Sequence, residues 1–384
     1  MAFNFSLLFR VAYHTVFNSR GTHARLTPKR IFSLLVISFL YCIIEAANWI
    51  GFFLDDILFP GYRRQQIRQP VFIIGPPRSG TTYLQRILAA DETQFSSMKT
   101  WEILFAPSVT QKKIIKAFCQ LDSLFGSPLY RLTRAIDKRL YKSLSSIHPG
   151  SLFEAEEDGL ILLHIFSSAT AFFVLPSAKD LWPYFLFDQQ LAAALRARIL
   201  KFYKRCVQSH LYVFGPDKTF LSKNPMFSTM IQSLDEAFPD AKFVYMARTP
   251  FETVPSTVSL VSYYFNTFMS PLEPYPYLED QLEMLSLYYT YPLIRFEALP
   301  ASRQETIAYT MLVEKPEQTV TELCARFGIT LSPAYAQALR KEQEKAFRYK
   351  SAHAYSLDQF SLKPEAIVKR YESIFDRFGF DRQP

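Results

Sequence analysis

The segment Gly75–Thr82 carries the clearest chemical signal in the chain. It reads Gly-Pro-Pro-Arg-Ser-Gly-Thr-Thr, so two glycines five residues apart are followed by two hydroxyl residues. This spacing is typical of a phosphate-binding loop. Glycines let the backbone approach an anion, and the N–H groups that open the following helix can hold its oxygens. The segment therefore predicts an anion site, with an ordinary Gly/Pro turn as the alternative.

The residue types at this loop argue against a nucleoside triphosphate. Thr81 stands where a triphosphatase has the lysine that reaches the β- and γ-phosphates beside magnesium, and Arg78 is the cation instead. The strand expected at Lys242–Ala247 ends in Arg248, not in a magnesium-binding aspartate. A P-loop kinase of small molecules is a rival class, but this chain lacks the residues that such a kinase uses to handle a γ-phosphate. The sequence shows no cluster of metal-ligating residues, so we predict no metal.

A second anion site is predicted at Arg248 and Ser256. Arg248 follows a strand, at the end where parallel sheets bind ligands. Ser256 lies eight residues further on, about two turns into the next helix. An arginine and a hydroxyl in these places can hold a phosphate other than the one in the loop. Taken alone, the pair would read as a surface arginine and a helix serine.

These residues need a scaffold of alternating strands and helices. Short runs at Val71–Ile74, Thr219–Ser222 and Lys242–Ala247 are typical of strands, and helical patterns follow them. The alternation predicts an α/β fold, with a P-loop-type parallel sheet flanked by helices, over residues 61–384. Residues 103–215 are expected to form a helical insertion between the first strand unit and the later ones. Helices expected within it are Lys112–Leu124, Glu154–Phe166 and Asp188–Val207.

Together, the two anion motifs resemble those of the sulfotransferases that use 3′-phosphoadenosine 5′-phosphosulfate (PAPS). The loop is similar to their 5′-phosphosulfate loop, and Arg248 and Ser256 have the spacing of their 3′-phosphate site. The resemblance covers about residues 70–380 and is strongest to a bacterial branch with Arg in the loop, related to tyrosylprotein sulfotransferases. Other family-like stretches are Lys223–Pro225, Phe238–Phe243, the pattern from Tyr309 to Gly328, and Tyr349–Leu357.

The resemblance implies an enzyme that takes its sulfuryl group from PAPS. Arg248 and Ser256 would hold the 3′-phosphate, and Lys223 would bridge toward the sulfonate oxygens. Arg78 would stabilise charge on the leaving phosphate. The residues implied to bind the 5′-phosphosulfate are Pro77, Arg78, Ser79, Gly80, Thr81 and Thr82.

The resemblance also bears on the catalytic base. Cytosolic sulfotransferases carry a base histidine two residues after a lysine, but here Pro225 stands two residues after Lys223. Tyrosylprotein sulfotransferases use a glutamate a little over twenty residues after the loop arginine, and Glu102 lies 24 residues after Arg78. A carboxylate there can accept the proton of the acceptor hydroxyl. We therefore expect Glu102 to be the base, with His148 as its rival and a surface helix glutamate as the alternative reading.

Several polar residues have no assigned role. The run Glu156-Glu157-Asp158 resembles an acidic element of the bacterial branch, and a solvated helix N-terminus explains it equally well. Lys350 and His353 would close the nucleotide site or simply lie on the surface. Cys324 stands where the dimerisation motif of cytosolic members closes with glutamate, so the sequence predicts no oligomeric state.

Residues 1–60 are predicted to associate with a membrane surface. Apolar residues recur at helical spacing over residues 3–17, and Ile31–Leu54 is an apolar stretch of 24 residues, long enough to span a bilayer. Glu45 and Asn48 interrupt this stretch, and a central carboxylate is costly in hydrocarbon. Attachment to one surface is therefore favoured over a true span or a soluble hydrophobic arm.

Composition and charge limit the kinds of partner that the chain is expected to bind. The formal net charge is +8, and five Lys or Arg with no Asp or Glu lie in the first 30 residues. This local charge indicates an anionic membrane surface rather than nucleic acid. Hydrophobic residues make up 49% of the chain, which excludes a disordered protein, and four scattered cysteines argue against a disulfide scaffold.

The acceptor is the part that the sequence does not identify. The insertion at residues 103–215 is expected to lie on the acceptor side and to form much of the acceptor cleft. Aromatic residues crowd it, but such density is more often core than ligand site. With a membrane-binding N-terminus, we expect a lipid or amphiphilic alcohol as the acceptor. Few cysteines and no glycosylation motif in the catalytic region favour the cytoplasmic face of a bacterial inner membrane. A non-catalytic membrane adaptor is the remaining rival class.

Overall fold

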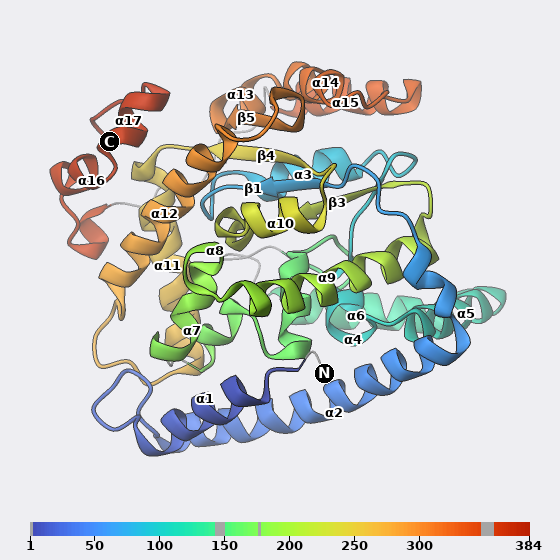
Figure 1. The fold of residues 1–384 in the computed structure, drawn as a ribbon, viewed down its shortest axis with the longest axis horizontal. Coiled ribbons are helices and arrows are strands. Elements are labelled where there is room, and N and C mark those ends of the chain that lie inside the picture. Colours follow the sequence, from blue (N-terminus) through green and yellow to red (C-terminus); the bar gives the residue numbers. More distant parts are fainter. Residues whose placement is uncertain (1–2, 143–149, 176–177, 347–356) are drawn as a thin grey trace.

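The computed structural model describes residues 3–142, 150–175, 178–346 and 357–384. Its centre is a five-stranded parallel sheet in the order β2-β3-β1-β4-β5 (Figure 1). The predicted α/β fold with a parallel sheet is confirmed. The strands are β1 Val71–Ile74, β2 Phe95–Ser96, β3 Thr219–Lys223, β4 Lys242–Ala247 and β5 Gln304–Ala308.

Both faces of the sheet are buried, as continuous apolar strands require. Val71 and Ile73 of β1 point into one core, and Phe72 and Ile74 point into the other, because successive side chains of a strand face opposite ways. The helices over the first face are α3 Thr81–Ala89, α13 Tyr309–Glu314, α14 Pro316–Arg326 and α15 Pro333–Ala346. The elements of the other core include α9 Ala193–Phe214, α10 Ile231–Ala237, α11 Pro250–Phe268, α12 Leu278–Phe296, α16 Pro364–Arg370 and α17 Glu372–Phe378.

The insertion is mostly helical, as predicted, but the predicted α-helix Glu154–Phe166 is wrong, and the predicted helix Asp188–Val207 is interrupted at Leu191 and Ala192. Residues 154–156 are not helical, because Ala155 bridges Lys99, Thr100 N–H donates to the Glu154 carbonyl and Glu156 N–H donates to the Met98 carbonyl. The helix after them is a 3₁₀ helix, η2 Asp158–Ile165. The remaining elements here are α4 Thr100–Phe105, α5 Val109–Leu124, α6 Pro128–Lys142, η3 Ala169–Phe173, α7 Ala178–Phe185 and α8 Phe187–Gln190. Short 3₁₀ helices elsewhere are η1 Pro60–Arg64, η4 Pro225–Thr229, η5 Ala301–Arg303 and η6 Leu357–Phe360.

Two N-terminal helices, α1 Phe5–Phe17 and α2 Pro28–Leu58, run along one side of the molecule (Figure 1). By length and composition α2 could cross a membrane, but its buried residues are mostly polar and bind the domain. Arg30 Nη1 donates to the Phe268 carbonyl at 2.8 Å, and Glu45 lies 2.6 Å from His164 Nδ1. The apolar side chains of α2 face outward, among them Phe32, Leu35, Phe39, Ile43, Ile50, Phe53 and Ile57.

The register of the sheet collects the predicted motifs at one edge. Ile73 of β1 pairs with Lys223 of β3, so Lys223 ends its strand just before the Gly75–Thr82 loop begins. Ala247 pairs with Ala308, so Arg248 and Tyr309 also leave their strands side by side. Parallel strands bind ligands at this carboxyl end.

Candidate active site

The loop is shaped by positions that a larger side chain could not occupy. Gly75 has φ +138°, and a Cβ there would lie 2.7 Å from the Met246 carbonyl oxygen. Gly80 has φ +95°, and a Cβ there would lie 2.6 Å from the Tyr309 ring. Glycine meets both demands because it lacks a Cβ and adopts positive φ freely. The loop thus fits tightly between β4 and Tyr309 and delivers Thr81 and Thr82 to the first turn of α3.

The loop has the features of an anion site. Ser79 is fully buried, and its hydroxyl has no hydrogen-bond partner among the described residues. An orphaned buried hydroxyl is costly, and an anion oxygen would satisfy it. Thr81 is also buried and opens α3, a helix whose N-terminal N–H groups favour negative charge. The residues present therefore fit a bound phosphate or sulfate group.

The structure brings the two predicted anion motifs into direct contact. Arg78 Nε donates to Ser256 Oγ at 2.9 Å, and Arg248 Nη1 donates to the Arg78 carbonyl at 2.8 Å. Arg248 Nε also pairs with Glu252 at 2.7 Å. Two guanidinium groups and a serine hydroxyl thus stand at one place, although 170 residues separate Arg78 from Arg248. This arrangement can hold two separate anionic groups of one ligand.

Two tyrosines that the sequence did not single out as ligand contacts adjoin this place. The Arg248 guanidinium lies 3.9 Å from the centre of the Tyr309 ring, a cation–π contact. Tyr309 and Tyr83 also line a pocket of about 750 Å³ beside α3 and α15. The position of Tyr309 directly after β5, at the same edge of the sheet as Arg248, is the feature that could have identified it as a ligand contact. Flat aromatic walls next to an anion site suit a nucleotide base.

Lys223 faces two carboxylates to which the sequence assigned no role. Its side chain is 1% exposed, and its Nζ lies 3.0 Å from Glu157 Oε1 and 3.7 Å from Glu156 Oε1. The Glu157 side chain is the more open of the two, with 27% exposure. Glu157 immediately precedes η2, and the isolated bridge between Lys99 and Ala155 fixes the preceding residues. A carboxylate is therefore held beside the lysine at the end of β3.

Asp158 makes its polar side-chain contacts with α9 and β3. It is buried, and it accepts hydrogen bonds from the Tyr203 hydroxyl and from Ser222 Oγ, the latter at 2.9 Å. Burial raises the pKa of Asp158 to about 7, although hydrogen bonds and the nearby Lys223 oppose this shift. The run Glu156-Glu157-Asp158 is thus divided between a lysine contact and a buried anchor.

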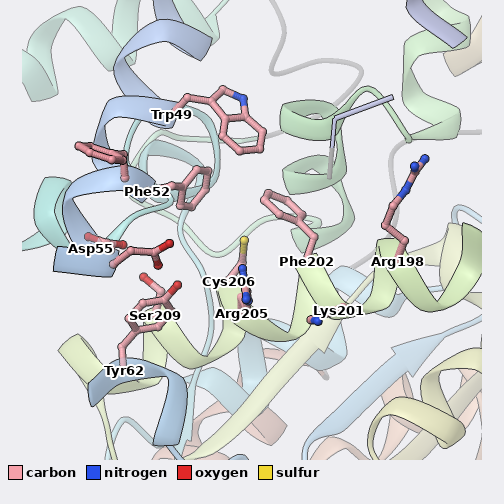
Figure 2. A pocket seen from close by; sticks show the side chains of 12 residues that line it. Trp49, Phe52, Asp55, Tyr62, Arg198, Lys201, Phe202, Arg205, Cys206 and Ser209 are labelled. Carbon is pink, nitrogen blue, oxygen red and sulfur yellow. The ribbon is translucent and has the colours of Figure 1, made fainter. Parts of the chain in front are cut away.

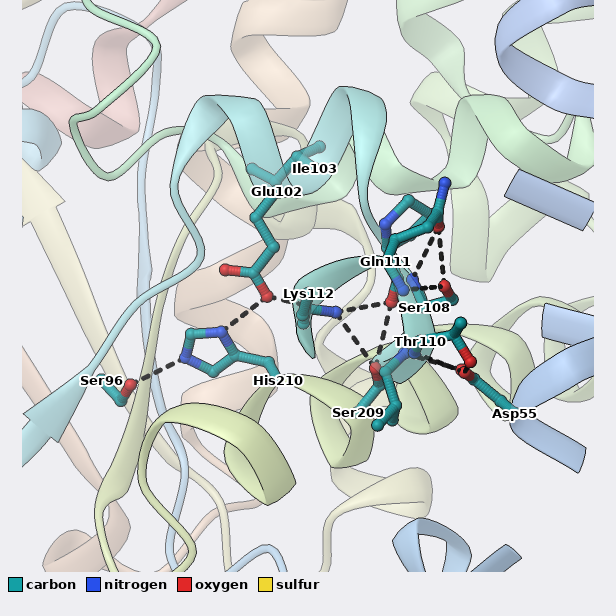
Figure 3. Close-up of polar contacts among 12 residues, drawn as sticks. Asp55, Ser96, Glu102, Ile103, Ser108, Thr110, Gln111, Lys112, Ser209 and His210 are labelled. Atoms are coloured by element: carbon teal, nitrogen blue, oxygen red, sulfur yellow. Dashed lines mark hydrogen bonds and ion pairs between the residues drawn. The ribbon is translucent and has the colours of Figure 1, made fainter. Parts of the chain in front are cut away.

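Glu102 lies in a buried network between α4, α5 and α9 (Figure 3). It is 1% exposed, and its Oε1 lies 2.7 Å from His210 Nδ1 and 3.3 Å from Lys112 Nζ. His210 Nε2 lies 2.8 Å from Ser96 Oγ. Burial alone would raise the pKa of Glu102, but the charges and hydrogen bonds of His210 and Lys112 hold it below its ordinary value.

The predicted site residues therefore fall into two groups. The contacts of Arg78, Ser256 and Arg248 join the loop to the second motif, and the register of the sheet sets Lys223 beside them. Glu102 instead makes its polar side-chain contacts with α5 and α9. The remaining candidates, His148, Lys350 and His353, lie outside the described residues.

Comparison with known proteins gives the family. Residues 70–333 match the model of the Sulfotransferase family. The omega-hydroxy-beta-dihydromenaquinone-9 sulfotransferases Stf3 of Mycobacterium bovis and Mycobacterium tuberculosis are each 26% identical over 318 residues, which is 82% of this chain and 76% of the relative.

Two solved structures share the fold over nearly the whole chain. Sulfotransferase STF9 from Mycobacterium avium has a TM-score of 0.75 at 15% identity and covers 99% of this chain and 98% of its own. Sulfotransferase STF1 from Mycobacterium tuberculosis has a TM-score of 0.67 at 20% identity, with coverages of 97% and 94%. Since the family match spans more than half of the chain and includes the loop, Lys223, Arg248 and Ser256, the chain belongs to the sulfotransferase family and is a sulfuryl-transferring enzyme.

Proposed function

We propose that this enzyme transfers a sulfuryl group from PAPS to a hydroxyl group of a lipid or other membrane amphiphile. The observation that carries the donor assignment is the contact of Arg78 with Ser256 and of Arg248 with the loop. PAPS carries a 5′-phosphosulfate and a separate 3′-phosphate, so it needs two adjoining anion sites. The absence of a lysine after Gly80, where Thr81 stands, speaks against a triphosphate donor.

Each loop residue has a defined task in this proposal. Arg78, the buried Ser79 hydroxyl and the first turn of α3 would neutralise the 5′-phosphate as it leaves. The residues that would surround this group are Pro77, Arg78, Ser79, Gly80, Thr81 and Thr82, with Lys223 on the sulfonate side. Preorganised charge of this kind supplies much of the rate enhancement in related group transfers. Arg248 and Ser256 would hold the 3′-phosphate, with the base of the nucleotide between Tyr83 and Tyr309.

The base proposed here is Glu157 rather than Glu102. Glu157 contacts Lys223 and keeps part of its side chain exposed, whereas Glu102 is enclosed by His210 and Lys112. In the transfer, the acceptor oxygen bonds to sulfur and the bond from sulfur to the phosphate oxygen breaks. The hydroxyl proton passes to the Glu157 carboxylate, and the electron pair leaves with 3′-phosphoadenosine 5′-phosphate. Lys223 would stabilise the sulfonate oxygens during this step.

The acceptor class and the location rest on the N-terminal helices and on the relatives. Stf3 is named for a hydroxylated dihydromenaquinone, an acceptor with a hydroxyl group on a lipid-like molecule. The outward apolar side of α2 supports attachment to a membrane, and the absence of a glycosylation motif in the catalytic region supports its cytoplasmic face. Cell fractionation tests the location, because a protein fully soluble after low-salt lysis would contradict it.

The test of the activity is transfer of labelled sulfate. Purified full-length protein, labelled PAPS and a bacterial membrane lipid extract should yield a labelled lipid, which mass spectrometry should show to be heavier by one SO₃ group. Arg78→Ala, at the loop cation, should abolish labelling. Labelling of no lipid by a protein that binds 3′-phosphoadenosine 5′-phosphate would overturn the lipid acceptor, and absence of nucleotide binding would overturn the donor.

A further inference from the structure

A pocket with almost wholly apolar walls opens between the two N-terminal helices and the insertion. It has a volume of about 680 Å³, within the range of small-molecule sites. Phe5 and Leu8 of α1, Leu34 and Tyr41 of α2, and Leu163 and Phe166 at the end of η2 line it. Apolar walls of this size suit a hydrocarbon chain.

The mouth of this pocket faces the outside between α1 and α2. Phe5, on its rim, is 47% exposed, and Ser38, Cys42 and Ala46 on the α2 rim are exposed as well. The same two helices carry the outward apolar side chains, such as Phe9 on α1 and Phe39 on α2. The opening therefore lies on the most apolar side of α1 and α2, where a bilayer would supply a ligand directly.

Few polar side chains interrupt the apolar wall. Glu45 lines the pocket but is only 7% exposed, and its Oε1 is already paired with His164. Ser38 and Thr170 add hydroxyl groups to the lining. A mostly apolar lining with few polar groups suits the hydrocarbon part of an amphiphile rather than its polar head.

The pocket and the reaction centre lie at two ends of the same short segment. Glu157 directly precedes η2, and Leu163, six residues later, lines the pocket, so about 12 Å of 3₁₀ helix joins them. A second link comes from Thr170, also in the wall, whose hydroxyl contacts Met226 Sδ at 3.6 Å. Met226 follows Lys223 by three residues.

Charge beside α2 matches an anionic bilayer. A second pocket, of about 530 Å³, lies between α2 and α9, with Trp49 and Phe52 on one side (Figure 2). On its other side, α9 presents Arg198, Lys201 and Arg205, all of them exposed. An interfacial helix sinks only about 5–10 Å into the headgroup and acyl boundary, so cations on the neighbouring helix would meet the lipid phosphates.

We propose that the pocket between α1, α2 and η2 receives the hydrocarbon chain of the acceptor directly from the bilayer on which α1 and α2 lie. The occupant is a long-chain amphiphilic alcohol, and the inference rests on the proposed function for the fate of its hydroxyl group. A water-soluble acceptor would not need this pocket. Transfer to long-chain acceptors therefore depends on it, and transfer to short ones does not.

Occupancy of the pocket can be measured without catalysis, through Trp49 on its wall. The full-length protein is bound to phosphatidylcholine–phosphatidylglycerol vesicles, and tryptophan fluorescence is compared with and without bromine on the acyl chains. Bromine should quench wild-type fluorescence, and Trp49→Phe should lose most of the quenched component. Because Trp49 also lines the second pocket and lies on α2, the quenching that belongs to this pocket is the part that Ala46→Phe at its mouth removes and Ala47→Phe outside it does not. Vesicle-bound protein with no quenching of Trp49 would overturn the proposal, as would assembly through this face into a dimer that does not bind vesicles.

A pair of neighbouring alanines provides the matched substitution. Ala46 lines the pocket and is exposed at its mouth, whereas Ala47 is also exposed on α2 but does not line the pocket. Ala46→Phe should lower transfer from PAPS to geranylgeraniol in vesicles by about tenfold or more, a usual range for filling or emptying an apolar pocket. It should leave transfer to geraniol in solution within about twofold, and Ala47→Phe should change neither.

Two outcomes separate this inference from the proposed function. Equal transfer to geranylgeraniol by the Ala46→Phe and Ala47→Phe proteins would overturn the pocket assignment while leaving sulfuryl transfer intact. If no alcohol is sulfated but Ala46→Phe, and not Ala47→Phe, lowers the quenching of Trp49, the pocket holds a lipid and the proposed reaction fails.

Discussion

Arg248 joins three parts of the site through one side chain. It donates to the Arg78 carbonyl, pairs with Glu252, and lies on the Tyr309 ring. The first of these contacts orders the loop, so a substitution at Arg248 should weaken every nucleotide to some extent. The contact with a 3′-phosphate would be additional and specific to nucleotides that carry one.

The first prediction follows from this difference. Arg248→Ala should lower the affinity for 3′-phosphoadenosine 5′-phosphate by about tenfold or more beyond any loss for adenosine 5′-phosphosulfate, because a charge-assisted contact is worth roughly 1.5–3 kcal/mol. Isothermal titration calorimetry with both nucleotides measures it. Arg382→Ala, at an exposed arginine near the C-terminus, is the control and should change neither affinity. Equal losses for both nucleotides would show that Arg248 does not recognise the 3′-phosphate.

The second prediction separates the two candidate bases. Glu157→Gln keeps the size of the side chain but cannot take a proton, so the single-turnover rate should fall by about 10²–10⁴, with donor affinity within a fewfold. Glu102→Gln breaks a buried pair with His210 and Lys112. It should therefore lower the free energy of unfolding while leaving the rate of the folded fraction much less changed. A normal rate in Glu157→Gln with a collapse in Glu102→Gln would return the base to Glu102.

The third prediction concerns pH and Asp158. Its pKa of about 7 in the folded state exceeds the ordinary 3.8, so protonation of Asp158 stabilises the folded state. This contribution to the free energy of unfolding is fully present below pH 3.8 and is lost as the pH rises through about 7. When the pH is lowered from about 8 to 5, the free energy of unfolding of the wild type should rise by roughly 2–3 kcal/mol relative to that of Asp158→Asn, which cannot titrate. Urea unfolding of both proteins at the two pH values measures this. Parallel pH profiles would mean that Asp158 is charged in the folded protein.

Helix α2 is held to the domain by buried polar residues at both ends and in its middle. Near its C-terminal end, Asp55 accepts hydrogen bonds from Val109 N–H, Thr110 N–H and Thr110 Oγ1, each at 2.7 Å, and so caps α5. The adjacent Asp56 is exposed and pairs with the exposed Arg63. These neighbours differ in burial and partners but not in chemistry, which makes them a matched pair.

The fourth prediction uses that pair. Asp55→Ala should lower the free energy of unfolding by about 2–4 kcal/mol, since it leaves the N-terminus of α5 without charged acceptors in a buried place. Asp56→Ala should lower it by less than about 1 kcal/mol, as is usual for an exposed ion pair. Denaturant unfolding followed by circular dichroism checks both values. Similar values for the two variants would show that α2 is not anchored through Asp55.

The elements differ in how far the sequence could predict them. The strands β1 and β4 and the loop after β1 follow from local patterns, since apolar runs and glycine spacing are encoded within a few residues. The role proposed for Glu157 depends on the bridge between Lys99 and Ala155 and on the pairing of Ile73 with Lys223. Such long-range contacts leave no local pattern.

The partners of the polar residues within α2 could not be predicted from the local sequence either. The sequence places Glu45 and Asn48 in an apolar stretch and makes a membrane span unfavourable. Only the fold supplies the partner, because His164 lies 119 residues from Glu45 along the chain. For the same reason Glu102 reads as a free carboxylate by spacing, although His210, 108 residues later, is its partner.

At the scale of the whole molecule, the proposed account places the donor and the bilayer on different sides of the insertion. The sheet and its loop edge lie away from α1 and α2, and the helices of the insertion, among them α4, α7 and α9, lie between them (Figure 1). In the proposed account, the donor stays on the aqueous side and the acceptor enters through the insertion. The nucleotide site is therefore expected to work in the same way whether or not a membrane is present.

The most direct test of the central claim is nucleotide competition on the purified full-length protein. Labelled 3′-phosphoadenosine 5′-phosphate is bound, and unlabelled adenosine 5′-phosphate or ATP is added, with magnesium or with a chelator. The account predicts that each competitor binds at least about tenfold more weakly than the labelled nucleotide, because neither carries a 3′-phosphate for Arg248 and Ser256. It also predicts that the chelator changes nothing. ATP that binds as tightly as 3′-phosphoadenosine 5′-phosphate, and only with magnesium, would contradict the account.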